Sequence, residues 1–290
     1  MSSSELYIIG NGFDIAHKMP TGYGDFRQWL IDNNRIDVIQ ELQSAYPEKI
    51  NDKYLLWSEF EKALGEYDLE TVINWSMESL CLTECYVGGQ TIYAPDFILN
   101  TRLPDIINDV FSRWISSVPI ATTKADYNIV QDALYLSFNY TDTLEQLYQV
   151  PESNVMHIHG RASKGEKLIV GHNRMINPAE YRDDKLDFRE NNERMQRLTD
   201  MNNLCKPVFE IIERNENFFK GLSGITDIHV IGHSCEKLDY PYFKKTMDSV
   251  SEDVKWHFCP YKENIEKDLK RMKLLIKEIG INPSNTTGVF

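Results

Sequence analysis

The sequence has no apolar run long enough to cross a membrane, no paired cysteine motif, and no repeated or low-complexity segment. A helical membrane span needs about 20 apolar residues, which excludes a transmembrane protein. The five cysteines are an odd number without framework or zinc-ligand spacing, and Cys81 and Cys85 receive no function. The first four residues, Met1-Ser2-Ser3-Ser4, carry no basic region and no export-length apolar segment. We therefore expect a cytoplasmic protein with no membrane partner and no structural zinc.

Basic residues are also in short supply. The chain has 31 Lys and Arg against 44 Asp and Glu, a formal net charge of −13. Such a charge repels nucleic acid and anionic membranes at long range, so it disfavours a nucleic-acid partner, although a local basic groove is compatible with it. Hydrophobic residues at 42% and charged residues at 26% are ordinary for a globular protein, and 290 residues can bury a sizeable core.

Short apolar runs separated by helix-length gaps predict an α/β protein with a mostly parallel, Rossmann-like sheet of about six strands. These runs are Leu6–Ile9, Leu134–Phe138, Val155–His159, Leu168–Val170 and Ile228–Ile231. The run Val254–Phe258 alternates between polar and apolar residues, which is typical of an edge strand. We expect helices on both faces of the sheet and a single domain over 1–290.

Two long segments lack strand patterns and are interpreted as helical insertions, one over 34–126 and one over 178–222, the second interrupted at Pro207. Apolar residues at helical spacing predict a helix after Pro104 and another before Gly280. The first face consists of Ile107, Val110, Phe111, Trp114 and Ile115, and the second of Ile265, Leu269, Met272, Ile276 and Ile279. The ten residues after Gly280 are polar, and we expect them to be loose.

Each predicted inner strand is followed by a polar cluster that combines glycine with histidine or asparagine. The clusters are Gly10-Asn11-Gly12-Phe13-Asp14, Asn139-Tyr140-Thr141-Asp142, His159-Gly160, Gly171-His172-Asn173 and Gly232-His233-Ser234. Ligands of open parallel sheets bind beyond the carboxyl ends of the strands. We therefore expect one polar pocket for a nucleotide-like ligand, with Gly12, Asn139, His159, Gly171 and Gly232 around it.

Taken one at a time, several of these motifs can also be explained by a purely structural role. The loop Gly10-Asn11-Gly12 lacks the third glycine of the dinucleotide fingerprint, since Ile15 stands there, and Asp14 could merely cap a helix. His157 and His159 share one face of a strand and could chelate a metal with His172, His233 and Asp14; without metal, His157 would pack behind His159. Trp57 and Glu61, four apart, are typical of an amphipathic core face.

Taken together, these blocks resemble the AbiH family of phage abortive-infection proteins. The opening Leu6–Asp14 with His17, Thr21, Tyr23 and Phe26 is similar to the start of that family. The resemblance continues in order through Trp57 and Glu61, Phe138–Thr141, His157–Gly160, Gly171-His172, and Gly232–Ser234 with Asp239. It covers nearly the whole chain and implies an anti-phage role, with a phage-derived molecule or a partner protein as the trigger. A homo-oligomer is left open.

A more distant resemblance concerns mechanism. The glycine loop, the strand ending in Asn139 and the strand ending in His159-Gly160 are similar to sirtuin-type NAD-binding proteins, and Asp25-Phe26-Arg27 echoes a sirtuin tripeptide. The resemblance implies hydrolysis of the N-glycosidic bond of NAD, as substrate rather than prosthetic group. Asn139 and His159 would be catalytic, with Asp14 stabilising charge on the ribose. The expected binding set is Gly10, Asn11, Gly12, Phe13, Thr141, Asp142, Gly160, His172, Gly232, His233 and Ser234, with no metal ligands.

The chain departs from the sirtuin pattern in three ways. Asn11 replaces the alanine of Gly-Ala-Gly, the paired CxxC zinc module of the deacylases is missing, and His17, His172 and His233 have no sirtuin counterpart. Two other functions therefore stay open. One is a metal-dependent nuclease or phosphohydrolase built on the histidines, and the other is a nucleotide sensor that binds without catalysis.

Overall fold

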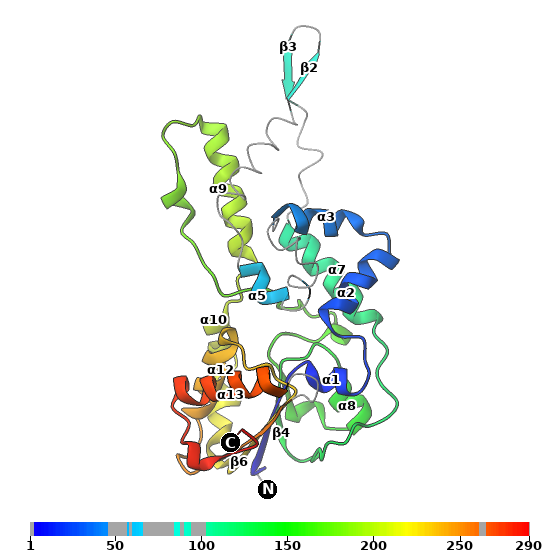
Figure 1. The fold of residues 1–290 in the computed structure, drawn as a ribbon, viewed down its shortest axis with the longest axis vertical. Helices are drawn as coiled ribbons and strands as arrows, with labels where there is room; N and C mark the ends of the chain where they lie inside the picture. Colours follow the sequence, from blue (N-terminus) through cyan, green and yellow to red (C-terminus); the bar gives the residue numbers. More distant parts are fainter. Residues whose placement is uncertain are drawn as a thin grey trace. The chain divides into compact units, whose positions relative to one another are not determined.

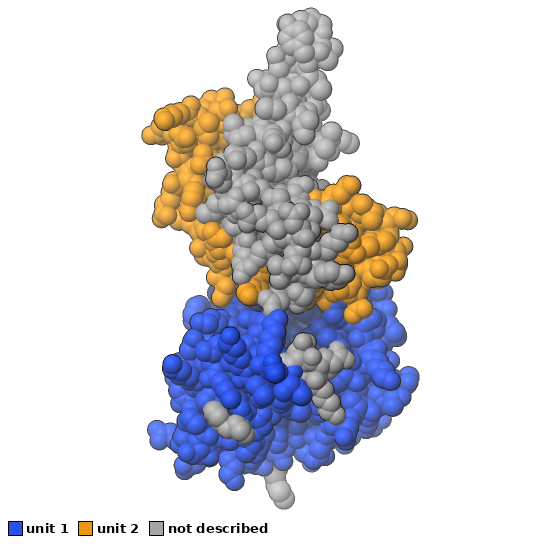
Figure 2. Space-filling model, viewed as in Figure 1, with its two compact units in different colours: residues 1–22, 114–169, 207–290 blue, residues 23–113, 170–206 orange. Residues whose placement is uncertain are grey.

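The computed structural model describes residues 3–45, 57, 60–65, 84–87, 90–93, 103–260 and 265–289. They form two compact units, each assembled from separate stretches of chain (Figure 2). Unit 1 comprises 1–22, 114–169 and 207–290, and unit 2 comprises 23–113 and 170–206. We expected one domain with insertions over 34–126 and 178–222; both of these ranges run across the unit boundaries.

Unit 1 is built on a six-stranded sheet in which every pairing is parallel. Its strands are β1 Glu5–Ile9, β4 Leu134–Ser137, β5 Val155–His157, β6 Asp227–Ile231, β7 Lys255–Cys259 and β8 Thr286–Thr287. The spatial order is β5-β4-β1-β6-β7-β8. Renumbered along this sheet, the order is 3-2-1-4-5-6, the doubly wound arrangement in which dinucleotides bind where the strand order reverses beside the first strand. The predicted fold class is confirmed.

Helices cover both faces of this sheet because the inner strands are apolar on both sides (Figure 1). On one face, side chains such as Leu6, Ile8 and Val230 join a core cluster with residues of α10 Val208–Arg214, α11 Glu216–Lys220, α12 Tyr240–Met247 and α13 Ile265–Ile279. On the other face, Tyr7 and Ile9 join a core with α1 Gly12–Ala16 and α8 Thr143–Tyr148.

Unit 2 is mainly helical. It contains α2 Tyr23–Asp32, α3 Ile36–Ala45, α5 Phe60–Gly65, α9 Phe188–Asn203 and most of α7 Leu103–Ser117. Phe26, Phe60 and Phe111 are buried and pack ring against ring, and Trp57 stacks on Phe60 at 5.5 Å. An antiparallel hairpin of β2 Glu84–Val87 and β3 Gln90–Tyr93 also lies here, although the sequence pattern indicated no strand over 34–126.

The structure bears out both predicted helices: the apolar face of α7 is buried, and α13 ends before Gly280, which has a φ of +85°. Three local expectations are wrong. Leu168–Val170 forms no strand. Its apolar residues Leu168 and Val170 are buried in a loop instead, and the N–H of Ile169 donates to His159 O at 2.9 Å. Residues 281–289 have defined structure, and β8 within them takes the edge position that we expected for β7.

No helix within the described ranges is long and apolar enough to span a bilayer.

Candidate functional site

Asn139 is held from several sides just beyond the end of β4. Its backbone N–H donates to Ser137 Oγ at 3.2 Å, its carbonyl accepts from His157 Nδ1 at 3.0 Å, and its side-chain amide hydrogen-bonds to Asp14. The residue is 5% exposed, and within the described chain its Oδ1 has no hydrogen-bond partner. A buried acceptor without a donor costs about 1–3 kcal/mol. A ligand hydroxyl, amide or water donating to Oδ1 would recover that free energy.

Asp14 lies behind this amide at the start of the chain's first helix. Its Oδ2 accepts from Thr141 Oγ1 at 2.5 Å and its Oδ1 from Thr143 Oγ1 at 2.8 Å. Burial raises the pKa of Asp14, although the hydrogen bonds from both threonines, the charge of His17 and the bond from Asn139 act in the opposite direction. Because the carboxylate accepts the Asn139 N–H, the amide is oriented with Oδ1 directed away from Asp14. Asp14 therefore orients the side chain of Asn139.

His159 follows β5 at the position level with Asn139, since β4 and β5 pair Ser137 with His157. It is 3% exposed, and its ring meets Phe138 edge-on at 5.3 Å. The ring of His233, after β6, meets the same Phe138 at 4.5 Å. The ends of β4, β5 and β6 therefore meet around one phenylalanine. Asn139 and His159 are both buried, and the His159 ring is covered by aromatic rings that include Phe138, Tyr140 and Tyr242.

His233 has a defined tautomer. Its Nδ1 accepts from the backbone N–H of Cys235 at 2.9 Å, so the proton resides on Nε2, which lies 3.5 Å from Asp239 Oδ2. This neutral ring can donate toward Asp239.

The glycine loops after β1 and β6 contact each other directly. Gly12 N–H donates to Gly232 O at 2.8 Å and Gly10 N–H to Ile231 O at 3.0 Å. Gly232 has a φ of +63°, and a Cβ on it would lie 2.2 Å from the backbone nitrogen of Phe13. The glycines are therefore needed for close approach of two backbones, and these two amides already have acceptors. Phosphate binding by this loop stays a prediction.

The other predicted residues fall into three groups. Phe13 is a fully buried core residue, and the side chain of Asn11 donates to Thr21 O at 2.7 Å, which fastens the loop after α1. Ser234 is exposed. Gly171 and His172 belong to unit 2, so their predicted place around the same cavity as Asn139 stays a prediction.

His172 is a buried neutral base within unit 2. Its Nδ1 accepts from Arg174 N–H at 3.0 Å and its Nε2 donates to Met201 O at 3.0 Å. Burial lowers the pKa of His172 to about 4; the Met201 carbonyl counteracts this, and the charge of Arg174 adds to it. In the same unit Glu61 forms an ion pair with the buried Lys206 at 2.7 Å, which gives it a structural partner beyond the amphipathic face that we expected.

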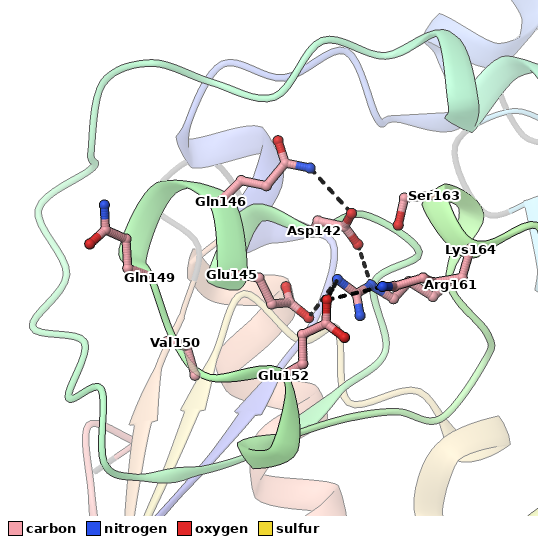
Figure 3. A pocket seen from close by; sticks show the side chains of 9 residues that line it. All are labelled: Asp142, Glu145, Gln146, Gln149, Val150, Glu152, Arg161, Ser163 and Lys164. Carbon is pink, nitrogen blue, oxygen red and sulfur yellow. Dashed lines mark hydrogen bonds and ion pairs between the residues drawn. The ribbon is translucent and has the colours of Figure 1, made fainter.

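A polar pocket of about 570 Å³ opens over α8 (Figure 3). It is lined by Asp142, Glu145, Gln146, Gln149, Val150, Glu152, Arg161, Ser163 and Lys164. Arg161 lies between the acids, with Nε 2.5 Å from Asp142 and one terminal nitrogen 3.3 Å from Glu152. Burial alone would raise the pKa of Asp142, but hydrogen bonds from Arg161 and Ser163 lower it overall. None of the five predicted rim residues lines this pocket.

Asp142, Glu145 and His157 are the three described residues whose ligand atoms lie close enough together, within 4.8 Å, to hold a metal ion. Arg161 already supplies positive charge there, bonded to Asp142 and 3.6 Å from Glu145. Both ring nitrogens of His157 face acceptors, namely the Asn139 carbonyl and Glu145 Oε1 at 2.8 Å. A metal ion would have to displace these contacts, so the group fits an arginine–histidine network better than a metal centre.

Glu145, Arg161 and Thr143 were not among the residues predicted from the sequence. Glu145 is one helical turn beyond Asp142, and Arg161 lies two residues beyond His159. The position of Glu145 one helical turn after Asp142 was the only indication in the sequence that it belongs to the site. Nothing in the sequence pattern indicated that Glu145 contacts His157 on β5.

Comparison with protein families matches residues 6–259 to the family of bacteriophage abortive infection AbiH. The chain belongs to the AbiH family. All the polar strand ends described above lie inside the matched range, and membership gives this AbiH protein a role in abortive infection against bacteriophage. Searches of curated proteins and of solved structures found no match.

Proposed function

We propose that this AbiH protein arrests infected cells by hydrolysing the N-glycosidic bond of NAD, with Asn139 and His159 as catalytic residues. The observation that carries the proposal is the buried Oδ1 of Asn139, which has no hydrogen-bond partner among the described residues, at the end of β4 in a 3-2-1-4-5-6 sheet. That strand order favours a dinucleotide at the carboxyl edge. The acceptor suits a ribose hydroxyl or the attacking water.

The reaction needs little acid catalysis because the nicotinamide ring of NAD carries a positive charge before the bond breaks and leaves as a neutral molecule. The bond between ribose C1′ and the ring nitrogen breaks, water adds to C1′, and the products are nicotinamide, ADP-ribose and one proton. Asn139 Oδ1 would orient the water or ribose, and His159 would accept the proton. Asp14 would act through Asn139 by fixing its amide, and the remaining stabilisation would be electrostatic.

The test measures NAD in phage-challenged cells and with the purified protein, for wild type, Asn139→Ala and His159→Gln. Gln is chosen because it preserves volume beside Phe138. Each variant should lose NAD consumption by about a hundredfold or more. Asn33→Ala is the matched control, since the same change is made on an exposed side chain. Intact NAD in cells that still arrest would overturn the proposal.

A metal-dependent hydrolase is the second candidate, favoured by the grouping of Asp142, Glu145 and His157. It predicts that a chelator abolishes activity and that Asn139→Ala is tolerated, whereas NAD hydrolysis as proposed is insensitive to chelator. A nucleotide sensor would instead bind NAD with saturation and leave it uncleaved.

A further inference from the structure

We propose that His157 and Glu145 are positioning residues that fix Asn139 for the reaction. The inference rests on the proposed function only in giving Asn139 its catalytic role. Its structural basis is a chain of contacts from α8 through β5 to the end of β4: Glu145 Oε1 to His157 Nε2 at 2.8 Å, and His157 Nδ1 to Asn139 O at 3.0 Å.

The backbone of Asn139 depends on side chains because β4 ends at Ser137. Its N–H donates to Ser137 Oγ and its carbonyl is held by the His157 ring, so side chains satisfy both of its backbone polar groups. These two bonds fix the backbone from which the Asn139 side chain projects, while Asp14 orients its amide. Releasing the carbonyl would let this backbone shift and carry Oδ1 with it, and a misplacement of about 1 Å can cost on the order of a hundredfold in rate.

The histidine ring is itself fixed. The side chains of His157 and Glu145 are 6% and 7% exposed, and Glu145 also lies 3.6 Å from the guanidinium of Arg161. Arg161 is anchored by Asp142 and Glu152, as Figure 3 shows. Two acceptors at opposite ends of the ring require a hydrogen on each nitrogen. The Glu145 contact is therefore charge-assisted, which makes it shorter and stronger than a neutral bond.

Two substitutions of His157 by a neutral amide side chain test the two ring nitrogens separately. His157→Asn places an amide nitrogen near the position of Nδ1, so it can still donate to Asn139 O. His157→Gln places its nitrogen near the position of Nε2, so it can reach Glu145 but not that carbonyl. The proposal predicts that His157→Gln lowers kcat for NAD hydrolysis by about thirtyfold or more with little change in KM. His157→Asn should lose less than a third as much. Equal losses in both variants, or none, would overturn the proposal.

A second measurement does not depend on activity. The side-chain amide resonance of Asn139 in ¹⁵N-labelled protein is assigned by its disappearance in Asn139→Ala. It should shift or broaden in His157→Gln and stay near its wild-type position in His157→Asn. Glu145→Gln, which keeps an acceptor but removes the charge, should shift it less than Glu145→Ala does. If this pattern appears without any NAD hydrolysis, the positioning stands and the proposed reaction fails. An unchanged Asn139 resonance in His157→Gln would overturn the positioning itself.

Discussion

Gly232 combines a left-handed backbone with a backbone contact, and a matched glycine separates the two effects. Gly165 has a similar φ, +66° against +63°, but a Cβ on it would meet nothing within 4 Å. Gly165→Ala should therefore lower the free energy of unfolding by only about 1–2 kcal/mol, the cost of the left-handed conformation. Gly232→Ala adds a clash with Phe13 N and should cost about 3 kcal/mol or more. Denaturant unfolding measures both; equal costs would show that the loops after β1 and β6 are not in contact.

His172 should make unit 2 sensitive to acid. The unfolded residue titrates near 6.5 and the folded one near 4, so the unfolded state binds more protons between these values. Stability is therefore complete above pH 6.5, falls as the pH drops toward 4, and by then has lost about 3 kcal/mol from this residue. Protonating Nδ1 would remove the acceptor of Arg174 N–H. Unfolding of wild type and His172→Gln across this range should give a shallower slope for the variant; parallel curves would contradict the assignment.

The segment after α13, which carries β8, can be tested by comparing a buried isoleucine with an exposed one. Ile281 is 5% exposed and packs into the core that α12 and α13 share, whereas Ile265 at the start of α13 is 44% exposed. Ile281→Ala should cost about 2–5 kcal/mol of unfolding free energy. Ile265→Ala should cost no more than about 0.5 kcal/mol. If both are nearly neutral by thermal and urea unfolding, the segment carrying β8 is not docked as described.

This segment also shows what sequence pattern can and cannot predict. The buried faces of α7 and α13 were predictable because several apolar residues recur at helical spacing, although Ile265, the first residue of the predicted α13 face, is exposed. The inner strands were predictable because they are apolar on both faces. β8 has two residues, Thr286 and Thr287, so no periodicity exists to detect it. Leu168 and Val170 are as apolar as a strand, yet they are buried in a loop. The apolar composition of a segment therefore indicates that it is buried. It does not indicate whether its backbone forms hydrogen bonds with a neighbouring strand and so joins the sheet.

The same distinction holds for the candidate site. The common location of Asn139, His159 and Asp14 was predictable because the carboxyl ends of parallel strands lie at one edge of the sheet. The Glu145–His157 contact was not, since it joins a helix to a different strand and depends on the register of β4 with β5. Burial of Asn139 and His159 was missed for a related reason. Phe138, Tyr140 and Tyr242 pack around the His159 ring, and such packing between residues far apart in the sequence leaves no periodic pattern.

At the scale of the whole molecule, net charge discriminates between an NAD-consuming enzyme and a nuclease. With 31 basic and 44 acidic side chains, the protein repels a polyanion at long range. A nucleic-acid enzyme gains most of its affinity from phosphate contacts, and that affinity falls steeply as salt rises. We therefore expect no binding of a labelled single-stranded RNA at about 50 or 200 mM salt, measured by fluorescence anisotropy with a basic RNA-binding protein as positive control. Any residual association should strengthen with added salt, because screening relieves the repulsion. Binding that is strong at low salt and weakens steeply on salt addition would reveal a basic groove that outweighs the net charge, and would favour the nuclease hypothesis over NAD hydrolysis.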